Sequence, residues 1–104
     1  MADEKRAAGR WTPPDESRGV VYCNGIREEA KLLDVSNSGM RARFLKPIPT
    51  GSEIYAKLVI VESEGPYYVL GEIIRMQQMK DDMWEASIQF NKIKQEPIRK
   101  EIPL

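Results

Sequence analysis

The sequence predicts an all-β protein, a six-stranded antiparallel barrel with a flexible N-terminal arm and a short C-terminal tail. Runs of β-branched and aromatic residues alternate with polar residues at a period of two, which is typical of strands with one buried face. Clusters of Gly, Pro, Asn, Asp and Ser separate these runs. A chain of 104 residues fits one domain. Closure into a barrel is favoured over a sandwich because it removes exposed sheet edges.

The N-terminal residues 1–18 differ in composition from the rest of the chain. They contain many charges, Gly9 and the pair Pro13-Pro14, and Trp11 is their main apolar side chain. Such a segment buries too little apolar surface to offset the entropy lost on ordering. We therefore expect residues 1–18 to form a flexible arm.

A β-hairpin is expected to follow the arm. Residues 20–23 and 26–33 have strand character, and the dipeptide Asn24-Gly25 separates them. Asn-Gly suits a type I′ turn because both central residues of that turn need a positive φ. The hairpin therefore supplies the first two strands of the barrel.

Four further strands are expected, over residues 40–44, 54–60, 67–76 and 84–90. The alternation is clearest in the last of them, where Trp84, Ala86, Ile88 and Phe90 would share one face. Trp84 is accordingly expected in the core, as is Cys23 at the end of its strand. The pattern places the core on one face of every strand.

A short tail is expected over residues 94–104, after a barrel that spans residues 19–93. Pro97 and Pro103 leave room there for at most one or two helical turns, around residues 98–102.

Composition excludes several classes of function. The chain has no His, and Cys23 is its single cysteine, so it lacks His/Cys metal sets, Ser-His-Asp or Cys-His nucleophile pairs and an internal disulfide. The adjacent carboxylates of Asp81 and Asp82 lie in a polar turn, residues 77–82, where the sequence offers no partner for acid–base catalysis. We therefore expect a protein that is not an enzyme and that needs no metal or cofactor.

Net charge and hydropathy indicate which partners and which compartment to expect. Sixteen Lys and Arg balance sixteen Asp and Glu, whereas general binders of DNA or RNA carry a basic excess. The longest apolar run, residues 58–61, is far shorter than the roughly 20 residues that span a bilayer. We expect a cytoplasmic protein without membrane insertion and without a nucleic acid partner.

Two short motifs stand out. Arg6 and Arg10 form RxxxR in the arm, and Asp34, Ser36 and Gly39 form DxSxxG at a strand end, in that order along the chain. Together they resemble the PilZ domain, a bacterial receptor module for cyclic di-GMP. The resemblance covers about residues 6–93 and implies a six-stranded barrel. It also implies that these five residues bind cyclic di-GMP and that the protein signals to a downstream protein that the sequence does not identify.

The chemistry of the five residues suits that ligand. Cyclic di-GMP presents two phosphodiesters and two guanines. Arginine binds phosphate oxygens or guanine O6 and N7 with two parallel hydrogen bonds, and it stacks on bases. Asp34 can accept from guanine N1–H and N2–H, and Ser36 can donate or accept at short range. Gly39 offers either a positive φ or room for the ligand.

Each motif also has a purely structural interpretation. Arg6 and Arg10 would be solubilising charges if DxSxxG were absent, and Asp34 and Ser36 can form an Asx or Ser/Thr turn that Gly39 ends. The turn role and the binding role are compatible.

Neighbouring residues are expected to stay outside the core site. We interpret Arg41, Arg43 and Arg75 as solvated strand charges on a polar face. Trp11, next to Arg10, is the better candidate for covering a bound base.

Three functions compete. The first is a cyclic di-GMP receptor whose arm wraps the ligand and changes the surface shown to a partner. The second is a PilZ-like protein-interaction module that does not bind the dinucleotide. The third is an oligonucleotide-binding barrel, which the neutral net charge disfavours. The five matching motif positions favour the receptor.

Overall fold

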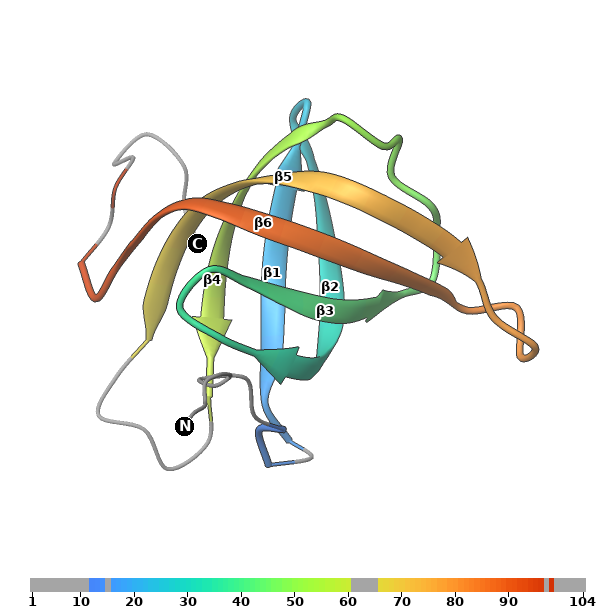
Figure 1. Ribbon diagram of the computed structural model, residues 1–104, viewed down its shortest axis with the longest axis horizontal. Coiled ribbons are helices and arrows are strands. Elements are labelled where there is room, and N and C mark those ends of the chain that lie inside the picture. The colour runs from blue at the N-terminus through green and yellow to red at the C-terminus, as the bar shows by residue number, and fades with distance from the viewer. Residues whose placement is uncertain (1–11, 15, 61–65, 97, 99–104) are drawn as a thin grey trace, which may run out of the picture.

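The fold is a closed β-barrel of six antiparallel strands, in the order β1-β2-β3-β6-β5-β4 (Figure 1). The structure is a computed structural model and describes residues 12–14, 16–60, 66–96 and 98. The strands are β1 (Arg18–Cys23), β2 (Ile26–Val35), β3 (Gly39–Phe44), β4 (Glu53–Val59), β5 (Tyr67–Gln78) and β6 (Trp84–Lys94). These described residues include no helix. The predicted all-β class and the six-stranded barrel are confirmed.

The predicted hairpin turn is present between β1 and β2. Asn24 and Gly25 have φ angles of 52° and 81°, and Cys23 pairs with Ile26 on either side of them. Two consecutive positive φ angles are what a type I′ turn requires, and Asn and Gly are the residues that tolerate them best. The local sequence therefore fixes where the hairpin bends and which residues pair.

The core is formed by the inward faces of the strands, as the alternation predicted. On β3 the buried side chains are Met40, Ala42 and Phe44, each at most 1% exposed. Cys23 is buried and unpaired, as expected, whereas Trp84, which was expected in the core, is partly buried and packs against it.

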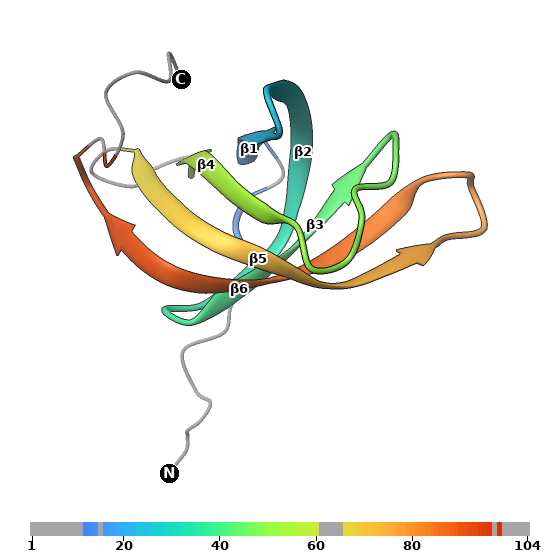
Figure 2. The same ribbon diagram turned by 90° about the horizontal axis from the view of Figure 1, so that it is seen from above.

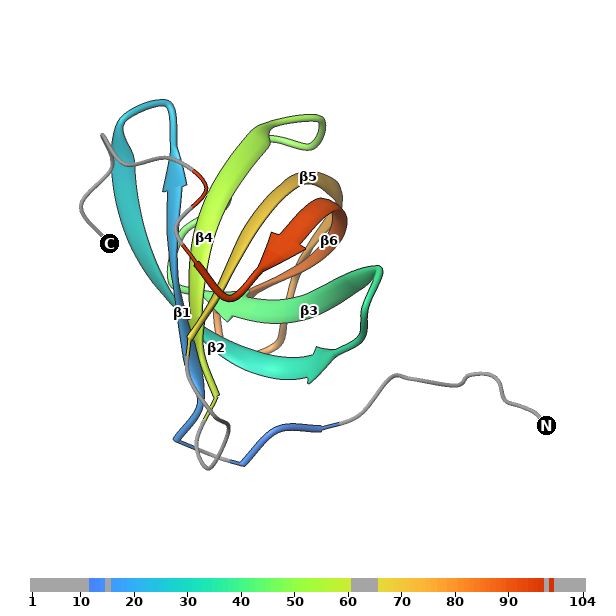
Figure 3. The same cartoon turned by 90° about the vertical axis from the view of Figure 1, so that its left-hand side faces the viewer.

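Tyr55 on β4 departs from the alternation. Its position predicts an outward side chain, yet it is only 2% exposed. Its hydroxyl accepts a hydrogen bond of 3.0 Å from the backbone N–H of Ile98. Ile98, which follows β6 in the chain, therefore lies against β4, and Figure 3 shows the coloured residues after β6 beside that strand. The sequence pattern could not show this contact, because it comes from a distant part of the chain.

Strands β5 and β6 are longer than the sequence predicted. They run side by side, and their hairpin projects at one end of the barrel (Figure 2). Polar residues such as Gln77 and Gln78 continue β5 in this hairpin, where the backbone pairs but the side chains are exposed. Alternation cannot detect such an extension, since no core lies beneath it.

The base of the N-terminal segment packs on the barrel. Pro13 and Ser17 are buried, and the Ser17 N–H donates a 2.9 Å hydrogen bond to the Pro14 carbonyl in a turn that leads into β1. Residues 1–11, which hold both arginines of RxxxR, lie outside the described residues. Most of the expected helical turn at residues 98–102 lies outside them as well.

Candidate functional site

A bulge in β2 determines where Asp34 points. Leu32 faces the core opposite Ala42, so simple alternation would also bury Asp34 in the core. The pairing of β2 with β3 shifts by one residue between Leu32 and Asp34. One extra residue in a strand moves every later side chain to the opposite face. Asp34 therefore lies on the outer face opposite Arg41, and Val35 faces the core.

Asp34 is part of an ion-pair network across three strands. Asp34 Oδ2 accepts a 2.6 Å hydrogen bond from Arg41 Nε, and Arg41 also donates to Glu85 Oε2 on β6 at 2.9 Å. The Asp34 side chain is 8% exposed, whereas the Arg41 side chain is 46% exposed. A cation that holds two carboxylates leaves one net negative charge in the network.

The electrostatics of the network keep Arg41 charged. The pKa of Arg41 is raised above its ordinary value, chiefly by its hydrogen bond to Asp34. Burial lowers this pKa, and the charge of Asp34 and the interactions with Glu85 raise it further. Arginine is protonated at neutral pH in any case, so Arg41 is a permanent neighbour of the Asp34 carboxylate.

Arg41 corrects one sequence-based expectation. It was interpreted as a solvated strand charge, but it is bound to the aspartate of the DxSxxG motif. The signal that could have found it is its position, because Arg41 is the first outward residue after Gly39. The bulge in β2 hid this pairing, since the sequence does not show which residue of β2 faces Arg41.

Ser36 organises the turn between β2 and β3. Its Oγ lies 3.2 Å from the backbone nitrogens of Ser38 and Gly39 and accepts hydrogen bonds from both. The backbone N–H of Ser36 donates to the Gly39 carbonyl at 2.8 Å, and the N–H of Phe90 donates to the Ser38 carbonyl at 2.8 Å. The Ser/Thr-turn interpretation of the motif therefore agrees with the structure, and the turn is attached to β6.

Gly39 is required by the close approach of β6 and not by a positive φ, which was one of the two reasons expected. Its φ is not in the left-handed region, in contrast to the φ angles of Gly25 and Gly51. A Cβ at Gly39 would lie 2.5 Å from the carbonyl oxygen of Ile88. The expectation of a positive φ is wrong, and the space that a side chain would need is occupied by β6.

Arg75 lies in the same row of side chains as the network. Asp34 faces Arg41, Arg41 faces Ser87, and Ser87 faces Arg75 across β2, β3, β6 and β5. The Arg75 guanidinium donates a 3.0 Å hydrogen bond to Gln77 and is exposed. The row thus has a carboxylate at one end and an accessible guanidinium at the other.

The charged groups of the site can form hydrogen bonds with a polar ligand. No group of three or more Asp, Glu, Cys or His that could hold a metal ion occurs among the described residues. Within the same part of the chain, no helix is long and apolar enough to cross a membrane. What the site offers is one carboxylate of low exposure with arginines beside it.

Comparison with known proteins identifies a family and solved structures of similar fold. A family model described as "PilZ domain" matches residues 4–102. No curated protein matches the sequence. Among the solved structures that match is the PilZ domain of YcgR from Escherichia coli with c-di-GMP. The sequence identity is 16% and the TM-score is 0.60, over 86% of this chain and 79% of that one.

Proposed function

This chain belongs to the PilZ domain family, and from that premise we propose that it is a receptor for cyclic di-GMP and not an enzyme. The ligand site consists of Arg6, Arg10, Asp34, Ser36 and Gly39. The receptor passes the signal to a partner protein that remains to be identified.

The observation that carries the proposal is the outward carboxylate of Asp34 beside a preorganised turn. An aspartate on the outer face of a strand is normally well exposed, yet this side chain is 8% exposed and is fixed by Arg41. A fixed carboxylate loses little conformational freedom when it binds the N1–H and N2–H of a guanine. We assign that role to Asp34, whereas Ser36 and Gly39 hold the turn that places it.

Ligand binding at Asp34 exchanges one hydrogen-bond partner of the carboxylate, Arg41, for another. A guanine edge that takes Oδ2 would displace the Arg41 Nε–H from a carboxylate that is 8% exposed, so the guanine N–H groups have to replace that hydrogen bond. Arg41 keeps Glu85 as a partner after the displacement. The released guanidinium can then face the ligand.

The two arginines of the arm complete the site. We assign to Arg6 and Arg10 the phosphodiesters and the O6 and N7 atoms of guanine, which arginine binds with two hydrogen bonds. The arm then closes over the ligand, which changes the surface next to β2 and β3. Amide hydrogen exchange of residues 1–11 tests this step, and we expect slower exchange at saturating cyclic di-GMP. Equal exchange with and without ligand would contradict the closure.

Isothermal titration calorimetry tests the proposed function. Cyclic di-GMP should bind at least tenfold more tightly than cyclic di-AMP, because adenine presents an acceptor at N1 where guanine presents a donor to Asp34. GMP, with one base and one phosphate, should bind more weakly than cyclic di-GMP. Equal affinity for all three nucleotides would contradict the assignment of Asp34.

A second function is favoured by one feature of the network. Arg41 and Glu85 give Asp34 an ordered environment in the empty protein. In a PilZ-like interaction module that does not bind the dinucleotide, these ion pairs alone would explain why Asp34 is present. The absence of any binding heat with cyclic di-GMP would favour that alternative.

A further inference from the structure

Three cations lie side by side on the outer face of β1, β2 and β3. Arg18 is the direct cross-strand partner of Lys31, and Lys31 is the direct partner of Arg43. Directly opposite residues point to the same face, with Cβ atoms about 4.5–5.5 Å apart. We call these three residues the cation row. It lies next to the row that contains Asp34 and Arg41.

The cation row is unfavourable for the empty protein. Like charges directly opposite each other on neighbouring strands repel and lower stability. An alternation of Lys or Arg with Glu across the three strands would remove this cost. An arrangement that weakens the fold is expected where function requires it.

The carboxylates near the cation row have other partners or are exposed, and Glu85, which lies directly opposite Arg43 on β6, is bound by Arg41. Glu29, which lines the space above the row, lies 3.4 Å from Arg27 in an ion pair. Asp81 comes only within 3.8 Å of Arg43, and its side chain is 58% exposed. Among the described residues, neither Lys31 nor Arg18 has a carboxylate oxygen within 4.0 Å.

Arg43 has an unused hydrogen-bond donor. Its Nε is shielded from solvent and has no hydrogen-bond partner. A buried donor without an acceptor costs free energy, and a donor on a charged group costs more. An acceptor that enters the space beside Arg43 would remove that cost.

A surface hollow lies over the cation row. It has a volume of about 270 Å³, and its lining includes Ser17, the three cations, Leu45 and Met83. Leu45 is 72% exposed, so the hollow has an apolar wall as well as a charged one. A ligand with an anionic group and a flat apolar ring matches both walls.

We propose that the cation row is an anion subsite that receives a phosphodiester of the bound dinucleotide, with Leu45 and Met83 against its sugar and base. The identity of the ligand in this assignment is taken from the proposed function. Arg43 lies two residues from Arg41 on the same face of β3, which is a distance of about 7 Å. A dinucleotide held at Asp34 therefore reaches the cation row.

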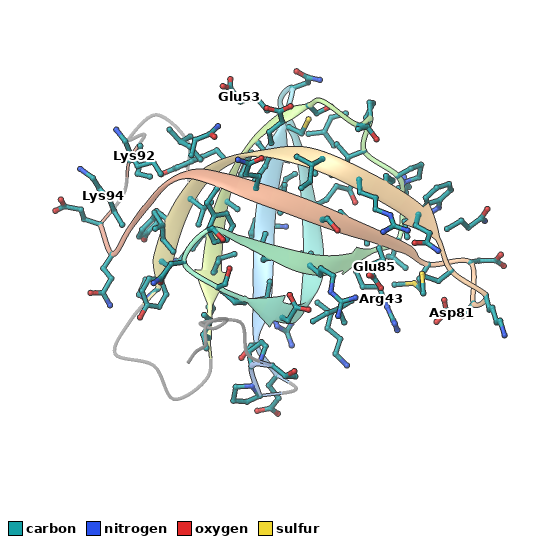
Figure 4. All side chains as sticks on the ribbon, viewed as in Figure 1. Arg43, Glu53, Asp81, Glu85, Lys92 and Lys94 are labelled. Carbon is teal, nitrogen blue, oxygen red and sulfur yellow. The ribbon has the colours of Figure 1, made fainter. Side chains whose placement is uncertain are left out.

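Substitution of the row tests the proposal. Arg43→Gln and Lys31→Gln are compared with Lys92→Gln, a change of the same charge on β6. Figure 4 shows Lys92 and Lys94 at the opposite end of the molecule from Arg43, Glu85 and Asp81. By calorimetry, Arg43→Gln should weaken cyclic di-GMP binding about tenfold, which corresponds to one charge-assisted contact. Lys31→Gln should weaken it at least threefold, and Lys92→Gln should leave it within twofold.

Thermal unfolding of the empty variants separates binding from structure. Lys31→Gln relieves repulsion from both neighbouring cations, whereas Arg43→Gln relieves the repulsion from Lys31 but loses the attraction of Glu85 and Asp81, so both melting temperatures should stay near that of the unmodified protein or rise. Weaker binding together with an unchanged or higher melting temperature supports the subsite. Unchanged binding in both variants overturns it. A melting temperature lowered by several degrees also overturns it, because the row would then be structural.

A second probe keeps the subsite distinct from the proposed function. If the unmodified protein does not bind cyclic di-GMP, the proposed function fails, and titration with GMP is followed through backbone amide NMR signals. Saturable shifts at Lys31, Arg43 and Leu45 that disappear in Arg43→Gln support an anion subsite. The absence of such shifts overturns it.

Discussion

Replacement of Gly39 by alanine tests why the DxSxxG motif ends in glycine. The added Cβ would lie 2.5 Å from the Ile88 carbonyl oxygen, where carbon and oxygen normally approach to about 3.3–3.6 Å. The obstacle is backbone, so β3 has to move away from β6 by roughly 1 Å. That movement stretches the 2.8 Å hydrogen bond from the Phe90 N–H to the Ser38 carbonyl.

The expected loss of stability follows from these contacts. Overpacking costs about 1–3 kcal/mol, and a weakened backbone hydrogen bond adds about 1 kcal/mol. Gly39→Ala should therefore lower the free energy of unfolding by about 2–4 kcal/mol, and Gly39→Val by more. In a domain of this size each 1 kcal/mol corresponds to about 4–8 °C in melting temperature. Binding should weaken as well, because the turn held by Ser36 moves with β3.

Urea unfolding with a matched control separates steric from backbone effects. Gly25 has a φ of 81° and no atom within 4 Å of an added Cβ, so Gly25→Ala introduces backbone strain alone. That strain costs about 1–2 kcal/mol. Gly71, whose Cβ would lie 2.6 Å from the Gln89 carbonyl oxygen, should respond to alanine as Gly39 does. If Gly39→Ala were no less stable than Gly25→Ala, the steric argument would be refuted.

The other predictions concern the charged residues of the motifs. Arg6→Ala and Arg10→Ala should each weaken cyclic di-GMP binding by at least about 2 kcal/mol, roughly thirtyfold, without a change in the melting temperature of the empty protein. Arg10→Lys should resemble Arg10→Ala, because lysine lacks the planar fork; wild-type affinity in Arg10→Lys would argue against a two-point contact. Asp34→Ala should lower the stability by about 1–2 kcal/mol in urea unfolding and abolish binding in calorimetry. Glu85→Gln, which removes the other partner of Arg41, is the control and should retain binding; equal binding by Asp34→Ala would place Asp34 outside the site.

Local signals in the sequence predicted most of the barrel. Asn24-Gly25 is a turn signal that needs no knowledge of the rest of the chain, and it formed where expected. The inward residues of β3 were correct because alternation reports burial directly. The same rule failed at Tyr55, whose burial depends on the backbone at Ile98. Burial that arises from a distant segment leaves no trace in local alternation.

The candidate site was less predictable, because its geometry depends on strand pairing. The motif indicated Asp34, Ser36 and Gly39, but the bulge that turns Asp34 outward is visible only when β2 is aligned with β3. Without that alignment the sequence indicates only a solvated strand charge at Arg41. Of the two reasons expected for Gly39, the positive φ is wrong, and the close approach of β6 could not be seen in the sequence.

A titration of the isotope-labelled protein with cyclic di-GMP, followed by backbone amide NMR, tests the central claim most directly. We expect saturable shifts at Asp34, Ser36 and Gly39, with little change at Asn24 and Gly25, in the turn at the far end of β2. Saturable shifts confined to the far end, or no shifts at all at millimolar ligand, would contradict a cyclic di-GMP site at the DxSxxG turn.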